Sequence, residues 1–261
     1  MDLSQPKIIE ETDNYAVVFK PAKMHCIPRS ANFDHEGANG AEEETKTLCG
    51  FVRLCGKDSS VLSFEAMHRL DYETHGLVLF AKNEKSYHFF KDLQDRGEFV
   101  KEYSAVCMKS TSPLPLGFPP CSLQLCRTFG SMSARGFSEN IIESYFRPFG
   151  PGRKLVRPVI DDGKKHKEIA KDNGGFYRTE IIGVNDNVFT VRLKRGFRHQ
   201  IRCHLCWIGF PILNDPLYLH ETENNTAELT DKMLALRAHA LFFADPASGE
   251  RKECRIAPIN T

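Results

Sequence analysis

The sequence predicts an α+β protein with a mixed, largely antiparallel central sheet flanked by helices and loops. Segments with strand patterns outnumber segments with helical patterns. Several pairs of strand segments are separated only by short turn sequences, which is typical of hairpins. No glycine-rich strand-to-helix phosphate loop is present, so an enzyme with a doubly wound sheet and a nucleotide cofactor is disfavoured.

Two short strands and a helix are predicted in the N-terminal region. Residues 7–10 and 15–19 have strand composition, and the polar residues 12–14 between them favour a turn. Pro21 ends the second strand because proline cannot donate to a ladder. Residues 31–46 are polar and predict an exposed loop. A short amphipathic helix ending at Gly56 follows, with apolar side chains at helical spacing. These side chains are Leu48, Phe51, Val52 and Cys55.

A second helix is predicted from the N-cap Asn83 to Gly97, with one apolar side. That side consists of Tyr87, Phe89, Phe90 and Leu93. Residues 99–107 then alternate as a strand, which places Tyr103 on the same side as Lys101.

The region from 110 to 175 is less regular. Residues 111–120 are rich in proline, and residues 141–146 fit either a strand or a helix. Residues 161–175 predict a charged surface loop, whose lysines fit a solvated face better than contact with a polyanion.

A hairpin and a third helix are predicted after residue 175. The turn residues 185–187 connect two strands, and Gly209 followed by Pro211 ends the helix. The elements of this region are strands at 177–184 and 188–193, a helix at 198–208, and further elements at 233–243 and 253–256.

Length and composition fit a globular protein with one large domain or two small ones. The 261 residues are 41% hydrophobic and 26% charged. No apolar run approaches the roughly eighteen residues that a membrane span needs. The N-terminus lacks the basic and apolar regions of a secretion signal, so we expect a cytoplasmic location.

The nine cysteines are best explained as small buried hydrophobic residues in a reducing compartment. A zinc site built from Cys203 and Cys206, with Cys121 and Cys126 as a second half, is the alternative. The spacing between these halves is long and the Cys121–Cys126 spacing is loose, so packing is favoured and no metal is expected.

Charge is unevenly distributed, although the net charge is only +1. Residues 187–214 contain no acid, whereas acids gather elsewhere, as in residues 42–44. The basic residues of the acid-free segment are Arg192, Lys194, Arg195, Arg198 and Arg202. A nearly neutral protein with this distribution can present one basic face to a polyanion.

Residues 67–76 place the carboxylate of Asp71 two residues after Arg69 and directly before an apolar segment, residues 77–80. A carboxylate loop supported by a buried strand is suited to hold one reactive group in place. The structural alternative is an aspartate that merely caps a turn.

Three segments occur in a distinctive order: His-Arg-Leu-Asp at 68–71, Lys-Glu-Tyr-Ser-Ala at 101–105 and Arg-His-Gln-Ile-Arg-Cys-His-Leu at 198–205. They resemble the RluA-type pseudouridine synthases, which show H-R-L-D-x-x-T-S-G, K-x-Y-x-A and H-Q-[I/L]-R-x-H. Residues 17–22 and 209–218 are similar to two further segments of that family. The resemblance covers most of residues 8–256 and is weak across 110–175.

The resemblance implies the pseudouridine synthase fold as a single catalytic domain over residues 1–261, with a core of about 8–256. No N-terminal S4-like RNA-binding domain is expected, because few residues precede this core. The implied partner is RNA, either ribosomal or transfer RNA, and the implied protein is a monomer without membrane attachment. In the implied reaction the N1–C1′ bond of a uridine breaks, the uracil turns, and C5 joins C1′. No cofactor is needed, because the bonds broken and formed balance within one nucleotide.

The resemblance also implies roles for single residues. Asp71 matches the essential aspartate, which acts either as a nucleophile on the sugar or as a base. Tyr103 matches the tyrosine that lies against the target base, and Arg202 matches the arginine that pairs with the aspartate. Arg69 matches the residue that fills the gap left by the displaced uridine. Further candidates for RNA contact are His68, Lys20, Lys101, Arg198 and His199.

Four positions depart from the family pattern. His75 stands where the family has serine, Phe197 shifts an arginine by one position, and Asn214 and Lys23 replace glycines. Two other hypotheses stay open, the first of them because of these departures. One is an RNA-binding protein on the same fold that has lost catalysis. The other is hydrolysis of the N-glycosidic bond by Asp71, which would release free uracil.

Overall fold

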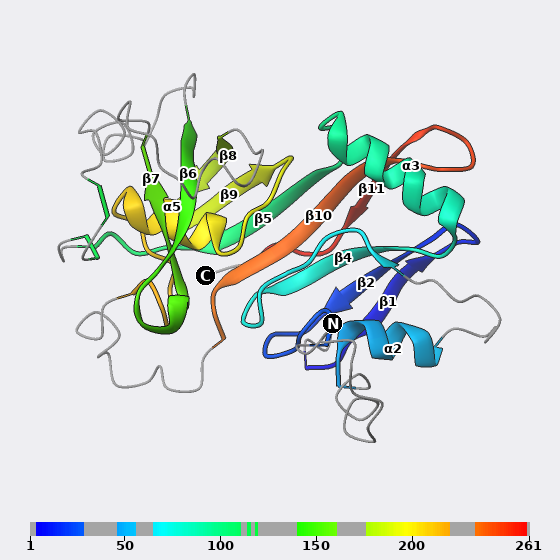
Figure 1. Cartoon of the computed structure of the whole chain (residues 1–261), viewed down its shortest axis with the longest axis horizontal. Helices are drawn as coiled ribbons and strands as arrows, with labels where there is room; N and C mark the ends of the chain where they lie inside the picture. The colour runs from blue at the N-terminus through cyan, green and yellow to red at the C-terminus, as the bar shows by residue number, and fades with distance from the viewer. Residues whose placement is uncertain are drawn as a thin grey trace. The chain divides into compact units, whose positions relative to one another are not determined.

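The computed structural model describes residues 4–28, 46–55, 65–110, 114–115, 118–119, 140–160, 176–219 and 233–259 (Figure 1). The chain divides into two compact units. The first unit combines Met1–Lys101 with Arg237–Pro258, and the second combines Glu102–Leu236 with Ile259–Thr261. The first unit is therefore discontinuous in sequence.

The sheet of the first unit has the strand order β1-β2-β4-β10. Its strands are β1 (Lys7–Glu11), β2 (Tyr15–Lys20), β4 (His75–Ala81) and β10 (Leu236–Ala244), with β3 (Glu65–Ala66) beside β4 and β11 (Arg251–Arg255) beside β10. The β1–β2 and β2–β4 pairs are antiparallel, whereas β4 and β10 are parallel, with His75 opposite Arg237. The sheet is mixed and largely antiparallel, as the sequence predicts.

Gly76 allows the close approach of β4 to β10. Its φ is +130°, and a Cβ atom at this position would lie 2.3 Å from the carbonyl oxygen of Ala238. Only a residue without a side chain fits this backbone contact. The parallel pairing therefore begins immediately after the loop that contains Asp71.

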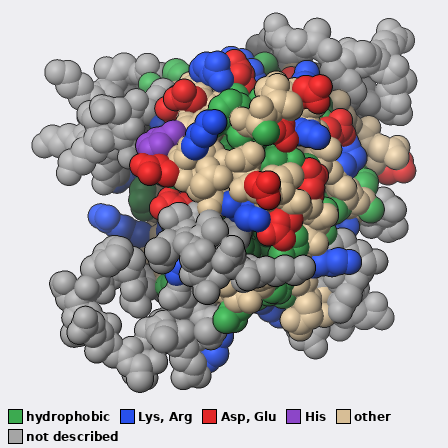
Figure 2. Space-filling model, turned by 90° about the vertical axis from the view of Figure 1, so that its right-hand side faces the viewer, with side chains coloured by type: hydrophobic (Ala, Val, Ile, Leu, Met, Phe, Trp, Pro, Cys, Tyr) green, Lys and Arg blue, Asp and Glu red, His purple; other side chains and the backbone are tan. Residues whose placement is uncertain are grey.

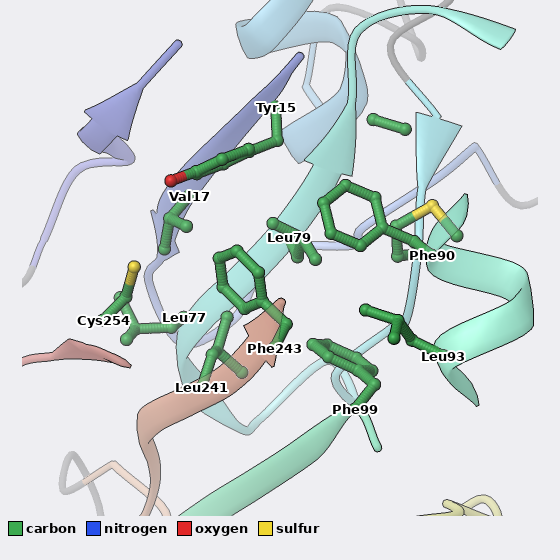
Figure 3. Packing of buried hydrophobic residues seen from close by; sticks show 12 residues of the cluster. Tyr15, Val17, Leu77, Leu79, Phe90, Leu93, Phe99, Leu241, Phe243 and Cys254 are labelled. Carbon is green, nitrogen blue, oxygen red and sulfur yellow. The ribbon is translucent and has the colours of Figure 1, made fainter. Parts of the chain in front are cut away.

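The core of the first unit lies between its sheet and helix α3 (Glu84–Asp95). Apolar side chains from β2, β4, α3, β10 and β11 point toward one another in Figure 3. The Phe243 ring lies edge-on to Tyr15 and Phe90, with centroid distances of 5.2 and 5.6 Å. Asn83 caps α3 as predicted, because its side chain accepts a hydrogen bond from the Ser86 N–H. Helix α2 (Leu48–Cys55) buries Leu48, Cys49 and Val52.

The second unit is built on the strand order β5-β9-β8-β6-β7. Its strands are β5 (Val100–Val106), β6 (Ile141–Phe149), β7 (Leu155–Val159), β8 (Tyr177–Asn185) and β9 (Val188–Leu193). A 3-10 turn, η1 (Pro151–Arg153), connects β6 to β7, and α5 (Gln200–Trp207) is buried along its whole length. Cys203 and Cys206 of α5 belong to an apolar cluster that includes Phe146 and Tyr218.

The predicted fold class is confirmed, and the predicted strands and helices appear within a few residues of their expected ends. Residues 141–146, which fit a strand or a helix, belong to strand β6. Helix α5 begins at Gln200 rather than near 198, because His199 adopts a left-handed φ of 56°. The sequence patterns did not predict β3, β7 or η1. The expected loops at 31–46, 111–120 and 161–175 lie largely outside the described residues.

None of the helices in the described part of the chain combines the length and apolar composition of a membrane-spanning segment. The described cysteines are free thiols. Those of Cys203 and Cys206 donate to the carbonyl oxygens of Val156 and Tyr218, at 3.5 and 3.3 Å. Cys121 and Cys126 of the alternative zinc site lie outside the described residues.

Candidate active site

The loop that carries Asp71 connects β3 to β4; its start is hydrogen-bonded to β4, and its end continues directly into β4. At its start, the Met67 N–H donates to the Leu79 carbonyl at 2.8 Å. The Leu79 N–H donates in return to Nε2 of His68 at 3.2 Å. Near its end, the Thr74 N–H donates to the Asp71 carbonyl at 3.1 Å. These bonds fix the backbone of the loop independently of the Asp71 side chain.

His68 supports this loop. Because Nε2 accepts a hydrogen bond from Leu79, the neutral ring carries its proton on Nδ1. Burial, followed by the charge of Lys101, lowers the pKa of His68 well below its usual value, so the ring is neutral at pH 7. The ring packs 5.3 Å from Phe99. His68 was expected to contact RNA; in the structure its ring braces the backbone.

Lys20 lies fully buried at the end of β2. Its ammonium donates to the carbonyl oxygens of Pro21 and Met24, at 2.9 and 2.8 Å, and to that of Tyr72 at 3.3 Å. Burial lowers the pKa of Lys20 to about 8, and the nearby carboxylates of Asp71 and Glu73 oppose this shift. Lys20 remains protonated at pH 7. Lys20 was expected to contact phosphate, but in the structure its side chain is enclosed by protein.

Two charged residues of the loop, Arg69 and Asp71, differ in exposure. The side chain of Arg69 is exposed, whereas Asp71 is half-buried. The flanking residues Leu70 and Tyr72 are each attached to the segment from Lys20 to Cys26. An arrangement of this kind holds one carboxylate in a fixed position while leaving part of it accessible.

His75, the first residue of β4, departs from the family pattern and is buried. Burial, followed by the charges of Arg237 and Lys20, lowers its pKa to about 3. Neither ring nitrogen has a hydrogen-bond partner among the described residues. The Phe19 ring lies edge-on to it at 6.4 Å. His75 is therefore neutral at pH 7 and contributes no charge to the Asp71 loop.

Lys101 and Tyr103 are both buried on β5. Lys101 belongs to the first unit, and its Nζ lies 5.1 Å from the centroid of the Phe99 ring. Burial lowers the pKa of Lys101 to about 8. Tyr103 belongs to the second unit and is 6% exposed. Lys101, like Lys20, is more enclosed than its expected role in phosphate contact requires.

Arg202 of α5 forms a buried two-point ion pair with Asp215 in the second unit. Its Nε and Nη2 donate to the two carboxylate oxygens of Asp215 at 2.8 and 2.6 Å. Asp215 also accepts the backbone N–H groups of Leu217 and Tyr218 at 2.9 and 3.1 Å. The sequence offered a signal for this partner, because Asp215 lies in the C-terminal segment that resembles the family. Its contact with Arg202 was nevertheless not predicted.

A basic region surrounds the start of α5. The exposed Arg198 donates from Nη2 to the carbonyl oxygens of Arg153 and Leu155, at 2.6 and 3.1 Å. This contact joins the acid-free segment 187–214 to a second acid-free segment, residues 144–160. The exposed cations of the two segments are Arg153, Lys154, Lys194, Arg195 and Arg198. Arg153 and Lys154 were not among the residues that the sequence patterns indicated for RNA contact. By contrast, acidic and basic side chains are interspersed on the face shown in Figure 2.

His199, another candidate for RNA contact, lies beside Tyr218. Its Nδ1 is 3.3 Å from the Tyr218 hydroxyl, which also bonds to the backbone of Val156. Burial, followed by the charges of Arg202 and Arg198, lowers the pKa of His199 to about 3. The ring is neutral at pH 7 and offers no charge to a phosphate.

The chemistry available to this site is that of a carboxylate on a fixed loop, which carries Asp71 and also Glu73. The described residues contain no group of three or more His, Cys, Asp or Glu side chains that could hold a metal ion. The histidines at the two ends of the loop, His68 and His75, have lowered pKa values and are uncharged at pH 7. A fixed carboxylate of this kind is suited to act as a nucleophile or as a base.

Comparison with known proteins gives a consistent family. The family model for RNA pseudouridylate synthase matches residues 14–207. Ribosomal large subunit pseudouridine synthase D of Xanthomonas campestris pv. campestris is 25% identical over 251 residues, which cover 93% of this chain and 63% of that protein. RNA pseudouridine synthase 1 of Oryza sativa subsp. japonica is 26% identical, and the match covers 94% of this chain and 70% of that protein.

An uncharacterized protein of Caenorhabditis elegans is 28% identical over 217 residues, which cover 81% of this chain but 38% of that protein. The chain thus spans less than two thirds of the length of two of these relatives. Among solved structures, human RNA Pseudouridylate Synthase Domain Containing 4 matches with a TM-score of 0.59 and 18% identity, covering 97% of this chain and 88% of its own. Human RNA Pseudouridylate Synthase Domain Containing 1 matches with a TM-score of 0.58 and 17% identity, and the match covers 98% of this chain and 85% of that chain. At these identities the structures are similar in fold.

Proposed function

Because this chain belongs to the RNA pseudouridylate synthase family, we propose that it isomerises uridine to pseudouridine in RNA. The N1–C1′ bond breaks, the uracil turns, and a C5–C1′ bond forms, while C5 loses a proton to solvent and N1 takes one up. The reaction is an intramolecular transfer that needs no cofactor. We further propose ribosomal or transfer RNA as the substrate and the cytoplasm as the location.

The observation that carries this proposal is the placement of Asp71. Asp71 is half-buried, on a loop whose start is hydrogen-bonded to β4 and whose backbone is also attached to the segment from Lys20 to Cys26. Fixing a reactive group before the substrate arrives lowers the barrier by removing the cost of ordering it. In our proposal Asp71 attacks C1′ of the sugar or removes a proton from the sugar.

Tyr103 and Arg202 have supporting roles in the proposal. The Tyr103 ring lies against the target base, and its hydroxyl faces the sugar. Arg202 supplies the positive charge that pairs with the catalytic carboxylate. In the structure, Nε and Nη2 of Arg202 donate to Asp215, which fixes the plane of the guanidinium group. Both units contribute to one catalytic domain in this proposal.

The candidates for RNA contact separate into two groups. Arg69 and Arg198 are exposed, which suits a residue that fills the gap left by a uridine and a residue that contacts phosphate. Lys20, His68, Lys101 and His199 are buried or neutral, so in our proposal they support the site by holding its backbone and packing.

The experiment uses unmodified transcripts of ribosomal and transfer RNA with tritium at C5 of uridine. We expect the wild-type protein to release tritium, and Asp71→Asn to release it about 10²- to 10⁴-fold more slowly. Glu73→Gln is the matched control, because it removes a carboxylate two residues away in the same loop. Activity in Asp71→Asn equal to that of the control would contradict the role of Asp71.

The same assay separates the alternatives. Free uracil in the product mixture, detected by chromatography, would instead identify hydrolysis of the N-glycosidic bond. RNA binding without tritium release would identify an RNA-binding protein that has lost catalysis. The unpartnered ring of His75, where the family has serine, is the observation that keeps this second function under test.

A further inference from the structure

The segment from Lys20 to Cys26 holds the backbone on both sides of Asp71. On the N-terminal side, Cys26 contacts Leu70, and on the C-terminal side, Lys20 donates to the Tyr72 carbonyl at 3.3 Å. The His25 ring also packs against the Tyr72 ring, with centroids 4.6 Å apart. All these residues belong to the first unit.

The Cys26 thiol makes an unusual pair of contacts. Its Sγ accepts a hydrogen bond from the Leu70 N–H at 3.3 Å and donates to the Leu70 carbonyl at 3.5 Å. The side chain is 4% exposed, and burial raises the pKa of the thiol, which keeps it protonated. A neutral thiol has one donor and a weak acceptor, and both are used here. The thiol thus bonds to both backbone groups of Leu70, as the backbone of a paired strand does in a sheet.

The thiol contacts two successive peptide groups: the Leu70 N–H belongs to the Arg69–Leu70 peptide bond, and the Leu70 carbonyl belongs to the Leu70–Asp71 peptide bond, which leads directly into Asp71. Rotation of this peptide group would move the Asp71 Cα and its carboxylate. Resting on the proposed function, we infer that Cys26 is a positioning residue for Asp71: its thiol fixes the orientation of the peptide group that precedes the catalytic carboxylate. Lys20 fixes the carbonyl on the other side.

A purely structural role of Cys26 makes a different prediction. If Cys26 only fills space in the core, valine replaces it well, because valine is apolar and of similar size. If Cys26 positions Asp71, serine replaces it better, because a hydroxyl group keeps a donor and an acceptor. Stability and turnover therefore rank the two variants in opposite orders under the positioning role.

The experiment measures kcat, KM and thermal midpoint for Cys26→Ser, Cys26→Val and Cys26→Ala, on a labelled transcript that the wild-type protein modifies. We expect Cys26→Val and Cys26→Ala to lower kcat by about 10-fold, since displacements of an ångström or less cost up to about 100-fold. KM should stay within about twofold of the wild type, because Cys26 contacts the loop backbone rather than the RNA. Cys26→Ser should retain more turnover than Cys26→Val while unfolding at a lower temperature.

The matched control is Cys49→Val. Cys49 is a buried cysteine of the same unit, and its thiol makes no hydrogen bond to the Asp71 loop among the described residues. The positioning role is overturned if Cys26→Val keeps the wild-type kcat, or if Cys49→Val loses as much turnover as Cys26→Val.

A second measurement separates this inference from the proposed function. The Leu70 amide should exchange its hydrogen about 10-fold faster in Cys26→Val than in Cys49→Val, because its acceptor is lost. Absence of tritium release by the wild-type protein would contradict the proposed function alone. Equal exchange of this amide in the two variants would contradict the inference about Cys26.

Discussion

Arg202 and Asp215 form a two-point ion pair whose side chains are 2% and 0% exposed. The pair connects α5 to the segment after it, because Asp215 also accepts two backbone N–H groups from that segment. A charge enclosed this completely is costly when its partner is removed.

Arg202→Met should therefore lower the free energy of unfolding by about 3–5 kcal/mol, since it leaves the Asp215 carboxylate buried and uncompensated. Urea unfolding at pH 7 measures this change. Arg178→Met is the control, because it removes an ion pair with Glu143 whose side chains are 62% and 42% exposed. The control should cost less than about 1 kcal/mol. Equal losses in the two variants would show that burial of the Arg202 pair has no energetic consequence.

His75→Leu should stabilise the protein. Both ring nitrogens of His75 are buried without a partner among the described residues, so an apolar residue of similar size removes unpaired polar atoms. We expect a gain of about 1 kcal/mol in the free energy of unfolding at pH 7. His204→Leu is the contrasting variant, because the ring of His204 bonds to Ser144 and Thr179 at 2.9 and 2.7 Å. It should lose stability, and a loss of the same size in His75→Leu would contradict this account.

The pH dependence of His75→Leu should also differ from that of the wild type. The pKa of His75 is about 3 in the folded protein and 6.5 in its unperturbed form, so the unfolded state binds the proton first. In the wild type, His75 therefore lowers the free energy of unfolding as the pH falls from 6.5 toward 3. The variant should lose less stability over that window, by up to about 1.4 kcal/mol per pH unit. Urea unfolding of both proteins at pH 4.5 and pH 6.5 measures this difference. If the free energy of unfolding changed equally between the two pH values in both proteins, the lowered pKa of His75 would be contradicted.

Lys20→Met should change stability in the opposite pH range. The pKa of Lys20 is lowered from 10.5 to about 8 by burial, so between these values the unfolded state binds more protons than the folded state. The stability of the wild type relative to Lys20→Met should therefore rise as the pH increases from 8 to 10.5. Urea unfolding of both proteins at pH 7 and pH 9.5 tests this. A difference that stays constant would exclude Lys20 as a buried, titrating cation.

Gly76→Ala should prevent the close approach of β4 to β10. A Cβ atom would lie 2.3 Å from the Ala238 carbonyl oxygen, at a φ of +130°. We expect a loss of more than about 2 kcal/mol or failure to fold. The control is Gly196→Ala, where an added Cβ meets nothing within 4 Å and φ is not in the left-handed region. Thermal unfolding compares the two variants. Equal midpoints would show that the close contact between Gly76 and Ala238 does not limit stability.

Local signals predicted much of this fold. The Asn83 cap, the end of β2 before Pro21 and the β8–β9 hairpin all depend on residues that are close in sequence, and the structure has each of them. Strands β3 and β7 were missed because they are short and become strands by pairing with β4 and β6. Their own sequences carry little information about those partners.

The motifs nominate Asp71, Tyr103 and Arg202 as site residues, and these roles stay predictions. The contacts could not be predicted from the motifs, because the Asp215 partner of Arg202 depends on a turn that forms after α5. A lysine at the end of a strand usually lies at the surface, so the burial of Lys20 was not foreseen. Its position follows from carbonyl groups of Met24 and Tyr72, the second of which is 52 residues away.

The discontinuity of the first unit has a consequence for synthesis on the ribosome. The loop with Asp71 lies in the N-terminal part, but β10, which pairs with the first residues of β4, begins at Leu236. Most of the second unit is translated between these two parts. During translation, the nascent chain therefore contains every residue of the proposed catalytic loop long before the strand that completes its sheet has emerged. The folding of the Asp71 carboxylate into its final environment is coupled to the translation of the segment that begins at Leu236.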